Sequence, residues 1–111
     1  MASNPKPDGD TPTVGQVPRI DLGLGHVLTR VVDSMGALVG FTDDHPDARD
    51  PSKTCAGSVA LEGQSWATPG RSWRMTTGDP ETLEGLTLEP SLLCTACGDH
   101  GFVRAGRWVP A

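Results

Sequence analysis

The sequence predicts a small, mostly β domain (a small α+β fold at most), and three observations lead to this prediction. The chain of 111 residues contains 14 Gly and 10 Pro, which favour turns over long helices. Its apolar residues fall in short, often β-branched runs with turn signals at close intervals. No stretch of useful length shows the 3.6-residue period of an amphipathic helix. We therefore expect five or six short strands in hairpins, with loops taking up a large share of the chain.

The amino-terminal residues 1–18 are expected to form a disordered tail. They include four Pro and two Gly and few apolar side chains, so they bury too little surface to offset the entropy of ordering. Residues 19–111 are then predicted to form one small β-rich domain. The start of the chain lacks the basic and apolar regions of a secretory signal, and no apolar run is long enough to span a membrane, so we expect a cytoplasmic protein.

In the first part of the domain, strands are expected where apolar or alternating runs lie between turn signals. Residues 33–36 (DSMG) place a Gly where a hairpin turn needs a positive φ. The Pro- and Asp-rich residues 45–52 are expected to interrupt regular structure. The predicted strands cover residues 28–32, 37–41, 58–61 and 72–76.

The last part of the chain contains one ambiguous segment and one hairpin. Residues 81–89 (ETLEGLTLE) are the only candidate for a helical turn, kept short by Gly85, whereas residues 86–93 could equally be extended. Residues 100–104 and 107–110 flank Ala105-Gly106, a two-residue connection typical of a tight hairpin.

The cysteines predict a metal site that resembles a zinc ribbon. Three Cys cannot form a closed disulfide framework, and without an export signal they indicate a reducing compartment. Cys94 and Cys97 form a C-x-x-C turn, in which Gly98 lets the backbone bend beneath the ion. His100 follows three residues later and adds a nitrogen ligand. Zinc suits mixed sulfur and nitrogen ligands, so we predict a structural Zn²⁺ ion that compensates for a thin core.

The fourth ligand is open to alternatives. We favour Cys55, because a free thiol in a loop is a liability, and this gives a Cys3His site. His45 is the reserve ligand, since it lies in the same region, and would give a Cys2His2 site. If water takes the fourth position, the metal becomes potentially catalytic.

The cysteines, histidines and tryptophans also allow other interpretations. The C-x-x-C pair could be a redox motif, but no helix is expected after it, and the three Cys could be ordinary buried residues. Asp99 is expected to accept a hydrogen bond from His100 and orient its ring. His26 is expected to face solvent. The three tryptophans are expected to fill the core: Trp66, Trp73 and Trp108.

The charge of the chain limits its partners. The formal net charge is −5, and the basic residues are scattered, so nucleic-acid binding is disfavoured. The acidic residues 43–53 are expected to form a solvated loop, although oxygens near His45 could attract a cation. A protein partner of unknown identity is expected to contact Arg104, Arg107 and Trp108.

The carboxyl-terminal forty residues resemble a family of small proteins of unknown function. The matching pattern is a Trp strand at Trp73, a T-L-x-P-S segment beginning at Thr87, the sequence C-T-A-C-G-D-H-G-F and a hairpin R-A-G-R-W. Members occur in bacteriophages of actinobacterial hosts and in bacterial operons. The resemblance implies metal binding, and a loop with a His and then a Cys upstream, which His45 and Cys55 match. A phage-encoded protein of this kind would act in the cytoplasm of the host cell.

These observations favour a small zinc-stabilised binding or accessory protein. The first alternative is a metal-dependent hydrolase with an open zinc position, in which a carboxylate acts as general base. The candidate bases are Asp43, Asp44, Glu89 and Asp99. The second alternative is a nucleic-acid-binding zinc ribbon.

Overall fold

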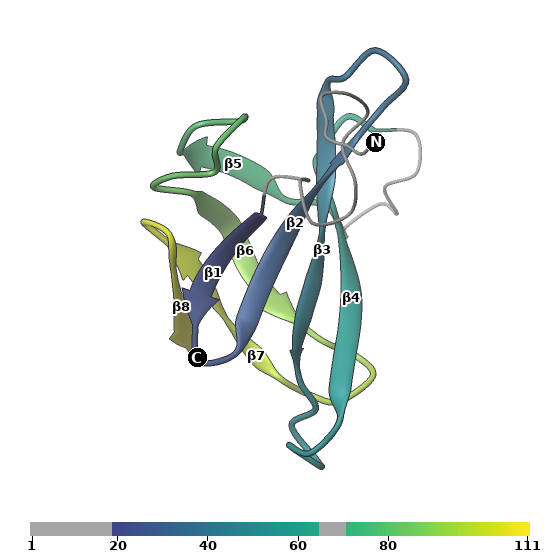
Figure 1. Ribbon diagram of the computed structural model, residues 1–111, viewed down its shortest axis with the longest axis vertical. Helices are drawn as coiled ribbons and strands as arrows, with labels where there is room; N and C mark the ends of the chain where they lie inside the picture. The colour runs from purple at the N-terminus through teal and green to yellow at the C-terminus, as the bar shows by residue number, and fades with distance from the viewer. Residues whose placement is uncertain (1–18, 65–70) are drawn as a thin grey trace, which may run out of the picture.

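The protein is all-β, as the sequence predicts. The computed structural model describes residues 19–64 and 71–111, and these contain eight strands in two four-stranded antiparallel sheets and no helix (Figure 1). None of the described residues forms a helix that could cross a membrane. The predicted tail and Trp66 lie outside the described residues. The strands are β1 (Arg19–Gly23), β2 (His26–Val32), β3 (Leu38–Pro46), β4 (Thr54–Ala60), β5 (Arg74–Thr77), β6 (Thr87–Leu93), β7 (His100–Arg104) and β8 (Arg107–Pro110).

The first sheet has the order β1-β2-β3-β4, so each strand pairs with its neighbour in sequence. The predicted hairpin between β2 and β3 is present, and Gly36 adopts a φ of 82° in its turn. Asp33 fastens this turn, because its Oδ1 accepts hydrogen bonds from the backbone N–H groups of Met35 and Ala37 at 2.9 Å each.

The second sheet has the order β5-β6-β7-β8. The predicted hairpin between β7 and β8 turns at Ala105 and Gly106, whose φ values of 50° and 77° fit a two-residue turn. The predicted helical turn at 81–89 is wrong. Leu83 and Gly85 have φ values of 68° and 70°, which an α-helix does not accept, and β6 begins at Thr87 instead.

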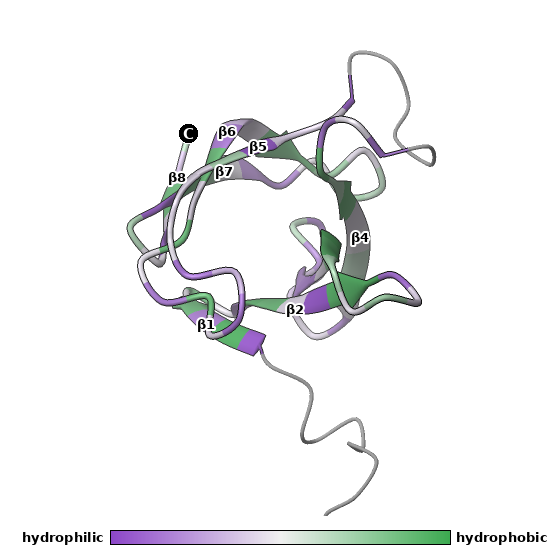
Figure 2. Cartoon of the chain, turned by 90° about the horizontal axis from the view of Figure 1, so that it is seen from above, coloured by the Kyte–Doolittle hydropathy of each residue, from purple (hydrophilic) through white to green (hydrophobic). Residues whose placement is uncertain are grey.

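The two sheets enclose the core between them (Figure 2). The two sheets contact each other on both sides of the core. On one side β1 contacts β8, and on the other the backbone N–H of Trp73 donates to the carbonyl of Ala60. Trp73 packs against the core, and its Nε1–H donates to the carbonyl of Ser91 at 3.1 Å. The fully buried core side chains include Leu28, Phe41, Leu83, Leu86, Leu88 and Val103.

The structure has more strands than the predicted five or six, and one predicted strand is longer than expected. Strand β1 was not expected, because the segment RIDLG offers only two apolar residues before its turn. Strand β3 continues through the acidic residues to Pro46, where the sequence predicted irregular structure. This continuation matters for the site, because it places His45 in a strand rather than in a loop.

Candidate metal centre

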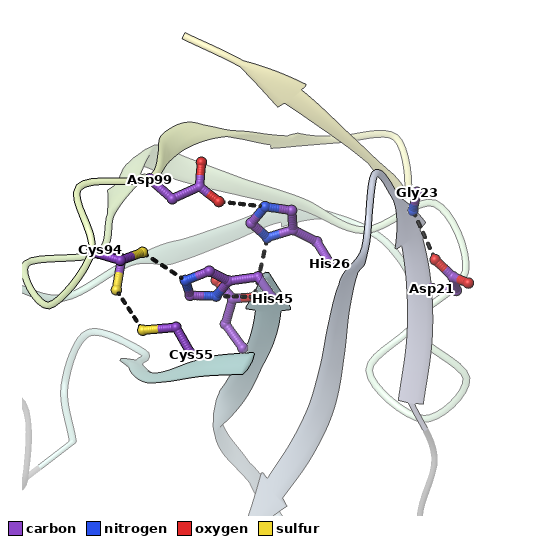
Figure 3. Close-up of polar contacts among 9 residues, drawn as sticks. Asp21, Gly23, His26, His45, Cys55, Cys94 and Asp99 are labelled. Carbon is purple, nitrogen blue, oxygen red and sulfur yellow. Dashed lines mark hydrogen bonds and ion pairs between the residues drawn. The ribbon is translucent and has the colours of Figure 1, made fainter. Parts of the chain in front are cut away.

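Four potential metal ligands converge at the end of the molecule where β3 and β4 meet the turn between β6 and β7. They are His45, Cys55, Cys94 and Cys97, and their ligand atoms all lie within 4.8 Å of one another. Nε2 of His45 lies 3.4 Å from Sγ of Cys97, and Sγ of Cys55 lies 3.5 Å from Sγ of Cys94 (Figure 3). The structure therefore brings all three cysteines and one histidine together as a group that can hold a metal ion.

The first sheet contributes His45 and Cys55 through its strand register. The two residues are directly opposite each other on β3 and β4, so their side chains lie on the same face. On β3 this inward face carries the core residue Phe41, then Asp43, then His45. The alternation of the strand thus continues the core directly into the polar site.

The second sheet contributes Cys94 and Cys97 through a tight turn. The backbone N–H of Gly98 donates to the carbonyl of Cys94 at 2.7 Å, and the N–H of Cys94 donates to the carbonyl of Asp99 at 2.8 Å. Gly98 has a φ of 86°, a conformation that suits glycine. This turn is the one predicted for a C-x-x-C-G segment, and it directs both sulfurs to one side.

The spacing of the four atoms fits a tetrahedral ion. With zinc–sulfur bonds of about 2.3 Å and zinc–nitrogen bonds of about 2.0 Å, neighbouring ligands are separated by about 3.8 Å between sulfurs and about 3.5 Å between sulfur and nitrogen. The distances of 3.5 Å and 3.4 Å are close to these values. These two pairs thus lie at about the separations that an ion would impose, and the remaining pairs lie within 4.8 Å.

The protonation of the ligands reflects their surroundings. A hydrogen bond from the backbone N–H of Ala48 lowers the pKa of Cys97 to about 6, with further help from the N–H of Asp99. Burial acts to lower the pKa of His45, but the hydrogen bond with Cys97 and the charge of Asp43 outweigh it and raise the pKa to about 9. The neighbouring Cys94 raises the pKa of Cys55 to about 12. Near neutral pH and without metal, these shifts favour a thiolate at Cys97 and a protonated imidazole at His45.

The structure places His100 away from this group, so the predicted ligand set needs correction. His100 is the first residue of β7 and lies on the exposed face, where its Nε2 is 2.9 Å from Oγ of Ser91. The next residue, Gly101, is buried, so the alternation of the strand turns the His100 side chain outward. His45, the reserve ligand of the sequence analysis, lies beside Cys97 in its place.

A second group of polar side chains, formed by His26, Asp43 and Asp99, adjoins the potential ligands at His45. Nε2 of His26 is 2.7 Å from Oδ2 of Asp99, and its Nδ1 is 3.3 Å from Oδ1 of Asp43. The same Asp43 oxygen is 3.4 Å from Nδ1 of His45, which is too long for a full hydrogen bond, and this buried nitrogen has no hydrogen-bond partner within the described part of the chain. The side chains of His45, Asp43, His26 and Asp99 thus lie in a row, in which each is within 3.4 Å of the next. Figure 3 labels His45, His26 and Asp99.

Two predictions about these residues are wrong. Asp99 pairs with His26 rather than with His100. His26 does not face solvent but is only 2% exposed, and its ring stacks on Trp108 with centroids 3.7 Å apart. The signal that could have found His26 is the alternation in HVLTRVV, which places it on the same face as the buried Leu28.

Of the three residues predicted to form a contact surface, two are exposed and one is buried. Arg104 and Arg107 are exposed, and the guanidinium of Arg104 lies 4.1 Å from the centre of the Phe102 ring. Trp108 is only 7% exposed and belongs to the core, so it cannot be part of a contact surface. Its role as a core residue agrees with the sequence analysis.

Comparison with protein-family models, curated proteins and solved structures gives no match for this chain. The resemblance to a family from actinobacterial phages therefore stays a prediction.

Proposed function

We propose that this chain is a small binding or accessory protein whose two sheets are held together by one structural zinc ion. The observation that carries the proposal is the origin of the ligands, two from each sheet. His45 and Cys55 come from adjacent strands of the first sheet, and Cys94 and Cys97 from one turn of the second. An ion bound to all four would connect the two halves of a thin core.

The donor set favours zinc over other ions. Three thiolates and one imidazole form a common structural zinc site, whereas Ca²⁺ and Mg²⁺ prefer oxygen ligands. The orientation of His45 supports the same assignment. With Nε2 directed at the sulfurs, its Nδ1 faces Asp43, and a carboxylate in this position fixes the ring of a zinc-bound histidine.

A structural role fits the geometry better than a catalytic one. Four protein ligands complete a tetrahedral site and leave no position for a reactive water, which the hydrolase alternative requires. The net charge of −5 continues to argue against a nucleic-acid-binding zinc ribbon. The exposed Arg104 and Arg107 are the residues through which we propose contact with a protein partner, in a phage or bacterial setting as the resemblance implies.

The test of this proposal is the metal content of the purified protein together with its cobalt spectrum. We expect stoichiometric zinc, and after exchange with Co²⁺ we expect the strong visible bands of a tetrahedral site and the near-ultraviolet bands of sulfur-to-cobalt charge transfer. A protein without stoichiometric zinc, or a weak spectrum typical of six oxygen and nitrogen ligands, would contradict the proposal.

Zinc affinity is expected to rise steeply with pH. Between about pH 7 and pH 8 the metal-free protein keeps the protons of His45 and Cys55, because their pKa values are raised to about 9 and about 12, while the pKa of Cys97, lowered to about 6, leaves it ionised. Zinc must displace these two protons, so falling pH favours the metal-free form. These two groups alone predict a change of roughly 100-fold in affinity per pH unit. Competition with a chromophoric chelator at several pH values measures it, and an affinity independent of pH would contradict the ligand set.

A further inference from the structure

The four proposed ligands differ in how accessible they are. Cys55 and Cys94 are partly exposed, whereas Cys97 is 3% exposed and His45 is 2% exposed. The two accessible ligands are both thiols and are neighbours, with their sulfur atoms 3.5 Å apart. Among the four proposed ligands, this pair of cysteines is therefore the one nearer to solvent.

The third sulfur, Sγ of Cys97, belongs to a more deeply buried residue than the other two. Cys97 is buried, and its Sγ lies 3.4 Å from Nε2 of His45. Burial keeps dissolved oxidants away from this sulfur. Cys97 is therefore less available for reaction than Cys55 or Cys94, although it shares the C-x-x-C turn with Cys94.

We propose that Cys55 and Cys94 form an oxidisable pair, which peroxides convert to a disulfide with release of the metal. This inference rests on the proposed zinc site and adds its regulation. Zinc-bound thiolates are deprotonated, which is the reactive form of cysteine towards peroxides.

The reaction balances with hydrogen peroxide as the oxidant. One thiolate of the pair attacks a peroxide oxygen, so that an S–O bond forms and the O–O bond breaks, and the departing hydroxide takes up a proton to give water. The second thiolate attacks the sulfur of the resulting sulfenic acid, so that the S–S bond forms and the S–O bond breaks. The second hydroxide also takes up a proton. The two sulfurs together lose two electrons, and the peroxide gains them.

The consequence for the metal follows from the ligand count. Oxidation removes two of four ligands and leaves only His45 and Cys97, which is too few for a stable structural zinc site. The new disulfide joins β4 to the turn after β6, so it still links the two sheets. We therefore expect oxidation to replace the metal crosslink with a covalent one, and the oxidised protein to stay folded.

The experiment follows zinc, thiols and disulfides in the same sample of the whole protein. The zinc content is measured first, and hydrogen peroxide is then added in the presence of a chromophoric zinc indicator. We expect zinc release to coincide with a fall from three reduced cysteines to one, counted after denaturation in chelator, and peptide mapping to find the Cys55–Cys94 disulfide. Reduction in the presence of zinc is expected to restore the starting state.

Met35 provides a matched control, because it is the most exposed sulfur among the described residues at 88% and lies far from the site in the β2–β3 turn. The Met35→Leu variant is expected to release zinc as the unmodified protein does. Loss of the response in this variant would show that methionine oxidation causes the release and would overturn the inference.

Two further outcomes distinguish a failure of the proposed zinc site from a failure of the oxidisable pair. Protein that contains no zinc before oxidation would overturn the proposed function itself. Protein that contains zinc but retains it under peroxide, or that forms a Cys94–Cys97 disulfide, would overturn the oxidisable pair while leaving the structural zinc site intact.

Discussion

Replacing His45 with alanine is expected to abolish stoichiometric zinc binding. The His45→Ala variant loses the only nitrogen atom that lies among the three sulfurs within the described part of the chain. Structural zinc contributes roughly 10–16 kcal/mol to the folding of small peptides. A decrease of only about 5 kcal/mol in the free energy of unfolding would already lower the melting temperature by about 20–40 °C. Metal analysis and thermal denaturation of the variant measure both effects.

His100→Ala is the matched control for this experiment. His100 is exposed and lies beside Ser91 rather than beside the sulfurs, so its removal is expected to leave the zinc content unchanged. The change in stability is expected to stay within about 0.5 kcal/mol, as is usual for surface substitutions. If His100→Ala lost zinc and His45→Ala kept it, the ligand set derived from the structure would be wrong and the one favoured by sequence alone would be correct.

Removal of the metal from the unmodified protein is expected to have an effect of similar size. A strong chelator should convert the protein to a form that melts on the order of 20 °C lower or is unfolded at room temperature. The reason is the small core, since hydrophobic residues make up 36% of the chain and aromatic residues only 5%. Circular dichroism during chelation, followed by zinc addition, measures the loss and its recovery.

The contrary result is informative as well. If the metal-free protein kept its melting temperature, the core, the backbone hydrogen bond between Trp73 and Ala60 and the His26–Asp99 pair would hold the two sheets together without the metal. Zinc, if bound, would then have a role other than stabilisation.

The sequence was most informative where local rules decide the structure. The hairpins at residues 33–36 and 105–106 were predicted because glycine permits the φ values that their turns require. The turn at Cys94–Gly98 followed from the same rule. Strand β1 was missed because its apolar residues are too few to stand out, and its burial depends on contact with β8.

The histidine of the site shows why the rest could not be predicted. His100 was favoured because it is close in sequence to Cys97, but the alternation of β7 turns it to the surface. His45 lies more than fifty residues from Cys97, and its position depends on the length of β3 and on its register with β4. Both are set by packing between distant segments, which a local pattern does not contain.

The division of the sheets along the chain has a consequence for the order of folding. All four strands of one sheet precede residue 61, and all four strands of the other follow residue 73. Each half can therefore pair its strands through contacts between sequence neighbours, which form quickly. Because each half holds only two ligands, tight capture of an ion is expected only after the halves have met. The metal would then slow their separation rather than initiate their assembly.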